Sequence, residues 1–298
     1  AYLHLMDTHY PYFAPAPFAG TWDQSGLDLN VNGNLVERQI LGEVEISDAQ
    51  LARIVDLYDE SILYSDAHLA PFIAGLLDSH PNTVVVLVAD HGEEFLEHGH
   101  LGHGHSLFQE LVHIPLVIWA PDLQPGRVNA QVRLMDIPPS LLEWAAAPIP
   151  ASMQGKALQP LTRGEESGPR PAPMETGGDQ QPQWHWRALS DGVWKWIARE
   201  ADLPHSGPEM ILSEREMAGP YSLLFNLDSD AEEGVDLLSS ESGHALRLKN
   251  LMTDSDWYFP PSHVLTLAIR SRDSISEEEA ARLAALGYAG DDKEEADG

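Results

Sequence analysis

The sequence feature that most constrains the fold is an uninterrupted apolar run over residues 84–88, which is followed by Asp90, His91 and Gly92. A run without polar alternation predicts a strand covered on both faces, as in a parallel sheet with helices on each side. Open α/β sheets bind ligands at the carboxyl ends of their strands. A carboxylate and an imidazole therefore lie where a ligand is expected, and Gly92 permits the sharp turn at that point.

The segments before this run predict an alternation of strand and helix. Residues 1–6 form a further strand candidate. Ser47 and Gln50 make a capping-box signature at the start of a helix over residues 47–77, whose apolar residues recur at helical spacing. Pro71 is expected to kink this helix or to split it in two. A helix between two strands indicates a βαβ unit.

The carboxyl-terminal part predicts a smaller α+β domain. Residues 151–173 are rich in Gly, Pro and Ser, so we expect a larger domain over residues 1–165 and a smaller one over residues 166–298. Ser-Asp-Gly at 190–192 separates two apolar segments and predicts a β-hairpin. The other expected elements are a third strand over 221–227, a helix over 274–286 and a disordered acidic tail over 291–298.

The composition is that of an acidic globular protein. The formal net charge of −30 repels nucleic acid and anionic membranes, and an anionic substrate would need a strong local cation. We interpret this charge as an adaptation for solubility or salt rather than as a partner-binding surface. No apolar run approaches the length of a transmembrane helix, and the absence of Cys excludes disulfides and Cys-based zinc sites. Because Ala1 lies inside a predicted strand, we expect the chain to be a fragment.

Several segments resemble the sulfatase family of the alkaline-phosphatase-like superfamily. They are ADHGEEFLEHG, GHGHSLFQE and IPLVIWAP within residues 89–121, and LHLMDTHYPY, RLMDIPPSLLEWA and SDGVWKWI elsewhere, in the order that the family shows. The resemblance implies an α/β sandwich with a mostly parallel central sheet, followed by a small antiparallel-sheet α+β domain. It also implies metal-dependent hydrolysis of a sulfate ester of a small molecule or glycan, in the periplasm or outside the cell.

The nucleophile segment of the family is missing from the sequence. Sulfatases make a formylglycine nucleophile from a Cys or Ser that precedes Pro-Ser-Arg, whereas this sequence contains neither a Cys nor that tripeptide. We therefore expect the 298-residue chain alone to be inactive. The identity of the upstream nucleophile would distinguish a sulfatase from a phosphonate monoester hydrolase or a phosphoethanolamine transferase. These enzymes share the Asp-His ending. A catalytically dead binding module is the alternative outside the enzymes.

Asp90 and His91 are the predicted metal ligands. A carboxylate favours calcium or magnesium and an imidazole favours zinc, manganese or iron, so the residue types alone leave the metal open. The resemblance implies Ca²⁺, because sulfatases accept His at the position of His91. It also implies that further ligands come from an upstream Asp pair and from the nucleophile. The alternative is an Asp that caps a turn beside an exposed His.

Three further His residues are candidates for contact with the ester. His9 resembles the family's His before a Pro-rich loop, and His103 stands where many sulfatases carry a Lys; both are predicted to be catalytic and to bind substrate. His103 departs from the family pattern, but a His can still protonate a leaving oxygen. His98 is a weaker substrate-binding candidate. Each could instead be a loop His bonded to backbone or solvent, and Glu93 and Glu94 are expected only to solvate the loop or cap the next segment.

Overall fold

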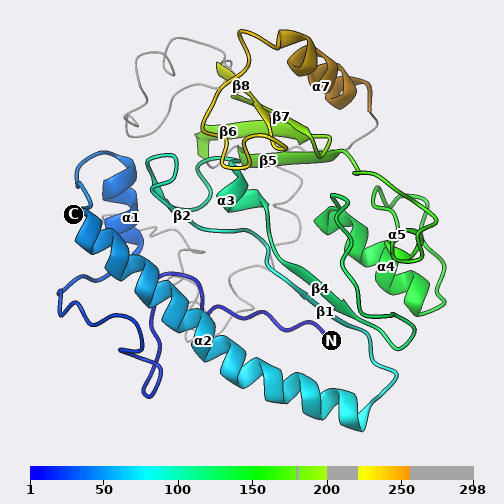
Figure 1. Ribbon diagram of the computed structural model, residues 1–298, viewed down its shortest axis with the longest axis horizontal. Helices are drawn as coiled ribbons and strands as arrows, with labels where there is room; N and C mark the ends of the chain where they lie inside the picture. Colours follow the sequence, from blue (N-terminus) through cyan, green and yellow to red (C-terminus); the bar gives the residue numbers. More distant parts are fainter. Residues whose placement is uncertain (179–180, 200–220, 256–298) are drawn as a thin grey trace, which may run out of the picture. The chain divides into compact units, whose positions relative to one another are not determined.

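The computed structural model describes residues 1–178, 181–199 and 221–255 (Figure 1). The chain forms two compact units. The described part of the first covers residues 1–73, and that of the second covers residues 74–255 apart from the two gaps. The helix predicted at 274–286 and the tail predicted at 291–298 lie outside the described residues.

The first unit contains most of a long helix, α2 (Asp48–Ser79). The predicted capping box is confirmed, since Ser47 N donates to Gln50 Oε1 at 3.0 Å and Gln50 N donates to Ser47 Oγ at 3.4 Å. The helix continues through Pro71, so the predicted split does not occur. Pro71 is exposed, and the carbonyl that loses its N–H partner there can bond to water instead.

A buried carboxylate on α2 anchors the segment that precedes the helix. Glu60 is almost fully buried, and its Oε1 accepts from the backbone N–H groups of Trp22 at 2.9 Å and Asp23 at 3.0 Å. The same segment contains α1 (Gly33–Ile40), which is capped by the Asn32 side chain. This helix was not among the predicted elements, because two turns give too little periodicity for the sequence to reveal.

Residues 1–6 do not form the predicted strand. The side chains of Tyr2 and Leu3 are exposed, and none of the strands in the described part of the chain pairs with this segment. Backbone N–H and C=O groups need partners, and a lone extended segment can find them only in water. The predicted βαβ unit is therefore not formed by the residues that the structure describes.

In the second unit, β1 (Val85–Val88) pairs antiparallel with β4 (Leu116–Trp119). The predicted covering of β1 on both faces is wrong for the described residues, because Leu87 is 44 % exposed and Val117 on its partner is 60 % exposed. These two strands form a two-stranded sheet by themselves. All the strand pairs that the structure describes are antiparallel, and the mostly parallel central sheet stays a prediction.

The second unit also contains a four-stranded antiparallel sheet. Its strands, in spatial order, are β5 (Ala172–Gly178), β6 (Gln181–Ser190), β7 (Trp194–Arg199) and β8 (Tyr221–Asn226). The predicted hairpin is confirmed between β6 and β7, where Asp191 Oδ1 accepts from Val193 N at 3.0 Å and Trp194 N at 2.8 Å. The predicted third strand is confirmed as β8, which pairs with β7.

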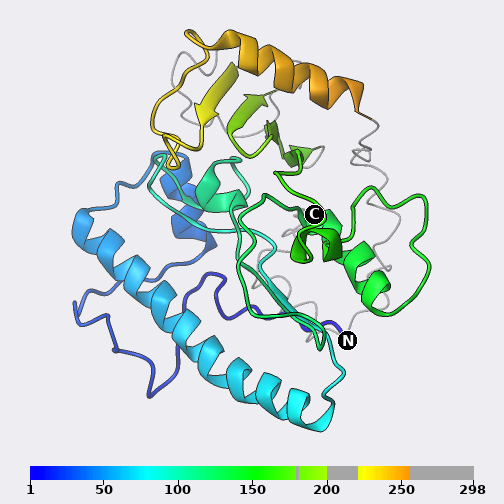
Figure 2. The same ribbon diagram turned by 45° about the vertical axis from the view of Figure 1, so that its right-hand side comes forward.

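This sheet lies between two groups of apolar side chains. One face packs against α7 (Ser242–Asp254), chiefly through Leu248. The other face packs against α3 (Gln109–Val112) and the residues just before it, where Leu107 meets Ile197 and its neighbours. Figure 2 shows α7 and α3 on opposite sides of the strands. The segment that follows the His-rich part of the chain is therefore packed directly on the carboxyl-terminal sheet.

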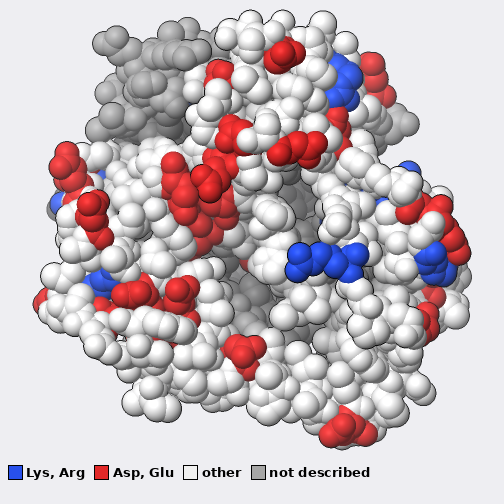
Figure 3. All heavy atoms as spheres, viewed as in Figure 1, with Lys and Arg blue, Asp and Glu red and all other residues white. Residues whose placement is uncertain are grey.

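The described surface is strongly acidic. On the face seen in Figure 3, acidic side chains cover more of the surface than basic ones, in keeping with the formal net charge of −30.

No helix among the described residues combines the length and the apolar character needed to cross a membrane.

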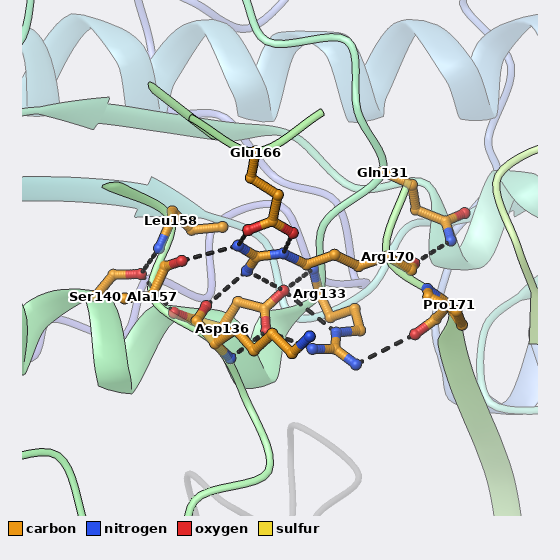
Figure 4. A network of polar contacts seen from close by, with 10 residues as sticks. Gln131, Arg133, Asp136, Ser140, Ala157, Leu158, Glu166, Arg170 and Pro171 are labelled. Carbon is orange, nitrogen blue, oxygen red and sulfur yellow. Dashed lines mark hydrogen bonds and ion pairs between the residues drawn. The ribbon is translucent and has the colours of Figure 1, made fainter. Parts of the chain in front are cut away.

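A buried charge network stabilises the segment between β4 and the sheet (Figure 4). That segment contains η1 (Leu134–Asp136), α4 (Ile137–Trp144) and α5 (Gln159–Thr162). Asp136 is fully buried and accepts from the Arg133 guanidinium and from Lys156 N, both at 2.8 Å. Burial alone would raise the pKa of Asp136, but these donors and the charge of Arg170 hold it below its ordinary value. Arg170 also lies 3.2 Å from Asp136 Oδ2, so an ion pair crosses the predicted boundary at residue 165.

Candidate active site

The turn after β1 places Asp90 and His91 together at the end of the strand. The Asp90 side chain is 65 % exposed, and its Oδ1 accepts from His91 N at 3.1 Å. His91 donates through Nδ1 to Gly92 O at 2.7 Å, because a carbonyl can only accept. The other ring nitrogen, Nε2, lies 3.8 Å from Asp90 Oδ1. An exposed carboxylate and an imidazole nitrogen therefore face the same space.

Gly92 lets this turn lie directly against α3. Its backbone N donates to Leu111 O at 2.8 Å, and a Cβ at this position would lie 1.9 Å from Glu110 O. A side chain therefore cannot be added there without moving backbone atoms of α3. The glycine of the Asp-His-Gly sequence is needed for this close approach, which fixes the turn against the helix.

A short hairpin returns the chain to the same turn. Its strands are β2 (Glu94–Phe95) and β3 (Leu101–Gly102), within the histidine loop, which we define as residues 93–105. The hairpin places His103 beside His91, with ring centroids 4.0 Å apart and an interplanar angle of 30°. His103 Nδ1 donates to Glu93 Oε1 at 2.9 Å. The predicted metal pair and one predicted catalytic residue are thus brought together.

Glu94 holds the histidine loop around a buried carboxylate. Its Oε1 accepts from the backbone N–H groups of His98 at 3.1 Å and His100 at 2.7 Å, and its Oε2 accepts from His105 Nε2 at 2.6 Å. Burial alone would raise the pKa of Glu94, but the bonds and charges of His105 and His100 lower it. The expectation that Glu93 and Glu94 merely solvate the loop or cap the next segment is wrong, because both are buried and each accepts from a histidine.

His98 is held by protein groups on three sides. Its ring stacks on that of Phe108, with centroids 3.7 Å apart and an angle of 2°. Nδ1 lies 2.6 Å from Glu110 Oε1, and Nε2 lies 3.4 Å from Glu233 O. Burial alone would lower the pKa of His98, but Glu110 and the Glu233 carbonyl raise it above its ordinary value. Both ring nitrogens point at protein acceptors, and the substrate contact by His98 stays a prediction.

A fully buried ion pair lies behind α3, and sequence analysis missed both of its members. Lys195 Nζ lies 2.9 Å from Glu233 Oε1 and 3.2 Å from Gln109 Oε1. Glu233 Oε2 in turn accepts from Gln109 N at 2.7 Å. The available signal was a Lys between Trp194 and Trp196, because a cation on a buried strand requires a carboxylate partner.

His9 lies in the first unit, whereas the other predicted site residues lie in the second. Its Nδ1 donates to Tyr10 O at 2.5 Å, and the two rings have centroids 4.4 Å apart. These contacts are those of a loop histidine bonded to backbone. The catalytic and substrate-binding role of His9 stays a prediction.

Two protein donors define the candidate cation site. Among residues 1–178, 181–199 and 221–255, no group of three or more His, Asp or Glu side chains is arranged to hold a metal ion. Asp90 and His91 supply one carboxylate and one imidazole nitrogen, which together suit a divalent cation but do not complete a coordination shell. They fit the predicted metal as part of a larger ligand set.

Comparison with known proteins gives one family. The model of the Sulfatase family matches residues 1–147. Arylsulfatase K of Canis lupus familiaris is 37 % identical over 101 residues, which cover 33 % of this chain and 19 % of that protein. Arylsulfatase K of Gallus gallus is 29 % identical over 169 residues, which cover 50 % of this chain and 31 % of that protein. This chain therefore spans less than a third of the length of these two relatives.

Solved structures with the alkaline-phosphatase-like fold are similar to this chain. A phosphonate monoester hydrolase from Silicibacter pomeroyi has a TM-score of 0.58 at 21 % identity, over 91 % of this chain and 57 % of that chain. BT4656, solved in complex with its substrate D-glucosamine-2-N,6-O-disulfate, has a TM-score of 0.53 at 17 % identity, over 74 % and 44 %. BT1596, a 2-O GAG sulfatase, has a TM-score of 0.53 at 19 % identity, over 70 % and 44 %. The family that this chain resembles is therefore the Sulfatase family, whose model matches residues 1–147.

Proposed function

We propose that this chain is part of a sulfuric ester hydrolase that cleaves a sulfate ester with the help of a divalent cation. The observation that carries the proposal is the stacking of His103 on His91, 4.0 Å between ring centroids, at the turn that also carries Asp90. A carboxylate and two imidazoles at the end of a strand can combine a cation with a group that exchanges protons. The family match over residues 1–147 supports the same reaction.

Asp90 and His91 would hold the cation. The bond from His91 Nδ1 to Gly92 O leaves Nε2 to carry the lone pair of a neutral imidazole, as a metal ligand requires. When bound, a divalent cation would stabilise negative charge on the ester oxygens. From the family resemblance we place Ca²⁺ ahead of Mn²⁺, Mg²⁺ and Zn²⁺.

His103 and His9 are the proposed catalytic residues. His103 would exchange a proton with the leaving oxygen of the ester, a contribution that is typically worth about 10²–10⁴ in rate. His9 would contact the ester, and His98 is the weaker substrate contact. The nucleophile would come from a further segment, because the sequence has no Cys and no Pro-Ser-Arg. The 298 residues alone would then not turn over an ester.

In the protein that contains this chain, β1 would belong to a mostly parallel central sheet. The exposed apolar side chains of Leu87 and Val117 support this arrangement, because strands of this composition are normally covered on both faces. A catalytic domain would include residues 1–165, and a smaller antiparallel-sheet domain residues 166–298.

The proposed substrate is a sulfated small molecule or glycan. Support comes from BT4656, solved with a disulfated glucosamine, and from BT1596, described as a 2-O GAG sulfatase. The net charge of −30 disfavours nucleic acid as a partner. The same charge makes a local cation necessary, since an anionic ester approaching this surface meets repulsion.

A phosphonate monoester hydrolase is the second candidate. The matched structure from Silicibacter pomeroyi covers 91 % of this chain, more than either BT4656 or BT1596 does. Sulfate and phosphonate monoesters present similar tetrahedral anions, so Asp90, His91 and His103 would serve both reactions in similar ways.

Two substrates separate these candidates in the protein that carries this chain together with its nucleophile segment. An aryl sulfate is expected to give a higher kcat/KM than an aryl phosphonate monoester, and Asp90→Ala should lower it by about 100-fold or more. His113→Ala, at an exposed residue outside the histidine loop, serves as the control. A higher kcat/KM for the phosphonate would favour the second candidate. A kcat/KM that Asp90→Ala leaves unchanged would contradict the proposed cation site.

Cation binding is tested separately by calorimetric titration, with Ca²⁺ and Mn²⁺, of the protein that carries this chain together with its nucleophile segment. Asp90→Ala and His91→Ala are expected to weaken binding by about 10-fold or more, whereas His100→Ala should have a smaller effect. His100 is the control because it lies in the neighbouring histidine loop and is bonded to Glu94 through its backbone. Equal losses in all three variants would refute the assignment of Asp90 and His91, and a complete lack of binding would favour a catalytically dead module.

A further inference from the structure

We propose that Glu93 is a positioning residue for His103, which holds the imidazole with its proton on Nδ1 and so makes Nε2 the nitrogen that meets the ester. The role of Nε2 toward an ester rests on the proposed function. The arrangement of Glu93 and His103 does not depend on that function, because it follows from the hairpin and from the hydrogen bond.

The hairpin register places the two residues opposite each other. β2 and β3 pair Glu94 with Gly102 and Phe95 with Leu101. Continuing this antiparallel register by one residue sets Glu93 opposite His103. Directly opposite residues project to the same side of an antiparallel pair, so a carboxylate and an imidazole meet there without any long loop to bring them together.

The hydrogen bond fixes one edge of the ring. His103 Nδ1 lies 2.9 Å from Glu93 Oε1, and an ionised carboxylate can only accept, so the proton lies on Nδ1. The Glu93 side chain is only 5 % exposed. A carboxylate that has lost most of its water needs a donor, which makes this bond costly to break. Nε2 is on the opposite edge of the ring and points away from Glu93.

The stack on His91 fixes the plane of the same ring. The two imidazoles lie 4.0 Å apart at 30°, and His91 is itself held through Nδ1 by Gly92 O at 2.7 Å. Both rings are thus anchored at Nδ1 by acceptors from the chain that follows Asp90. His103 therefore has its orientation set by two independent contacts, one at an edge and one at a face.

The neighbouring pair, Glu94 and His105, is bonded through the other ring nitrogen. Glu94 accepts from His105 through Nε2 rather than Nδ1, at 2.6 Å, and both side chains are almost completely buried. His105 is therefore enclosed by the loop, whereas the anchor on Glu93 leaves the Nε2 edge of His103 directed elsewhere. The successive carboxylates of Glu93 and Glu94 thus give two histidines different roles.

The consequence for chemistry is that proton exchange is confined to one nitrogen. Because Glu93 holds the Nδ1 proton, only Nε2 can exchange a proton with the ester. As the nucleophile from the further segment forms its bond to sulfur, the S–O bond would break and its electron pair would go to the leaving oxygen, which Nε2 would face. Without Glu93 the neutral ring is released to place its proton on Nε2, and it then meets the ester in the wrong tautomer.

Nitrogen NMR of the histidine side chains tests the proposal on the 298-residue chain, with no need for turnover. Long-range ¹H–¹⁵N spectra in alkaline buffer distinguish the Nδ1–H tautomer from the Nε2–H tautomer, and His103→Gln identifies the signals. The wild-type chain is expected to show the Nδ1–H tautomer at His103. Glu93→Leu should convert it to the Nε2–H form, and Glu93→Gln, whose amide oxygen can still accept, should keep part of the Nδ1–H form.

The control is Glu97→Gln, which removes the same charge from an exposed position in the histidine loop and should leave the tautomer unchanged. If Glu93→Leu fails to fold, the wild-type and Glu93→Gln spectra still decide the matter. An Nε2–H tautomer in the wild-type chain, or a tautomer that no Glu93 variant alters, would overturn the proposal. Failure of the proposed function would appear instead as absent ester hydrolysis, a separate measurement.

Discussion

Lys195 and Glu233 form an ion pair with no exposed side-chain atoms, in which Nζ lies 2.9 Å from Oε1. The pair connects β7 to the segment after β8, and Glu233 also reaches α3 by accepting from Gln109 N. Burial lowers the pKa of Lys195 and raises that of Glu233, and each opposes the shift of the other. Each charge therefore persists in the interior only because its partner is present.

Removing one member of this pair is expected to cost more than removing both. Lys195→Met should lower the free energy of unfolding by about 3–5 kcal/mol, because it leaves a buried carboxylate without its cation. The double variant Lys195→Met/Glu233→Gln should lose less than Lys195→Met alone, and therefore less than the sum of the single losses. Urea unfolding measures these values, with Lys249→Met on the exposed side of α7 as control. Strictly additive losses would show that the two residues are not coupled.

The stability contributed by His98 is expected to fall as the pH rises. Burial alone would lower its pKa, but Glu110 and the Glu233 carbonyl raise it above the ordinary value. A raised folded pKa gives stability that is complete below the unfolded pKa of about 6.5 and is lost as the pH rises through the folded pKa. The geometry agrees, since both ring nitrogens face acceptors and only the imidazolium has two N–H donors.

The measurement is the difference in free energy of unfolding between the wild-type chain and His98→Gln across neutral pH. The difference should be largest in mildly acidic buffer and should shrink in alkaline buffer. The charged groups around His98 are Glu110 on α3, Glu94 on β2, and the Glu233–Lys195 pair behind α3. His113→Gln, at an exposed histidine, is the control. A difference that does not change with pH would mean that His98 is neutral throughout.

A methyl group at Gly92 is expected to destabilise the chain, whereas one at Gly75 should stabilise it. At Gly92 a Cβ would lie 1.9 Å from Glu110 O, a backbone atom that cannot move without α3, so a loss of about 1–3 kcal/mol or more is expected. Gly75 lies inside α2 with nothing within 4 Å of a Cβ, so Gly75→Ala should gain up to about 1 kcal/mol. Denaturant unfolding of the two variants and the wild type measures both changes in the free energy of unfolding.

The local signals in the sequence were reliable where a short segment determines its own structure. Ser47 with Gln50 correctly marked the start of α2, and Ser-Asp-Gly at 190–192 correctly marked the β6–β7 hairpin. The apolar run that ends at Asp90 correctly marked a strand followed by a close turn. In the first two cases the hydrogen-bond partners are only a few residues apart, so the pattern of residue types contains the interaction.

Interactions that depend on register or on distant partners could not be predicted in this way. The sequence does not reveal that Glu93 and Glu94 are buried, because the β2–β3 hairpin lacks alternation and is rich in Gly and His, so its register is not visible. Glu233 meets Lys195 from 38 positions away. The expected strand over residues 1–6 failed for a related reason, since a strand exists only where a neighbour supplies hydrogen bonds.

Loss of His103 is expected to slow esters with poor leaving groups far more than esters with good ones. The assay uses the protein that carries this chain with its nucleophile segment, and compares His103→Ala with the wild type on two sulfate esters that differ in leaving-group acidity. A good leaving group departs as an anion and gains little from a proton, whereas a poor one needs the proton that Nε2 would supply. The expected loss is therefore about 10²–10⁴ in kcat for the poor leaving group and much smaller for the good one.

The matched control is His105→Ala. It removes the histidine that lies two residues after His103 and is hydrogen-bonded to Glu94. Equal losses for both esters would mean that His103 only orients the sulfate. No loss for either ester would mean that His103 is a solvated loop residue with no catalytic role.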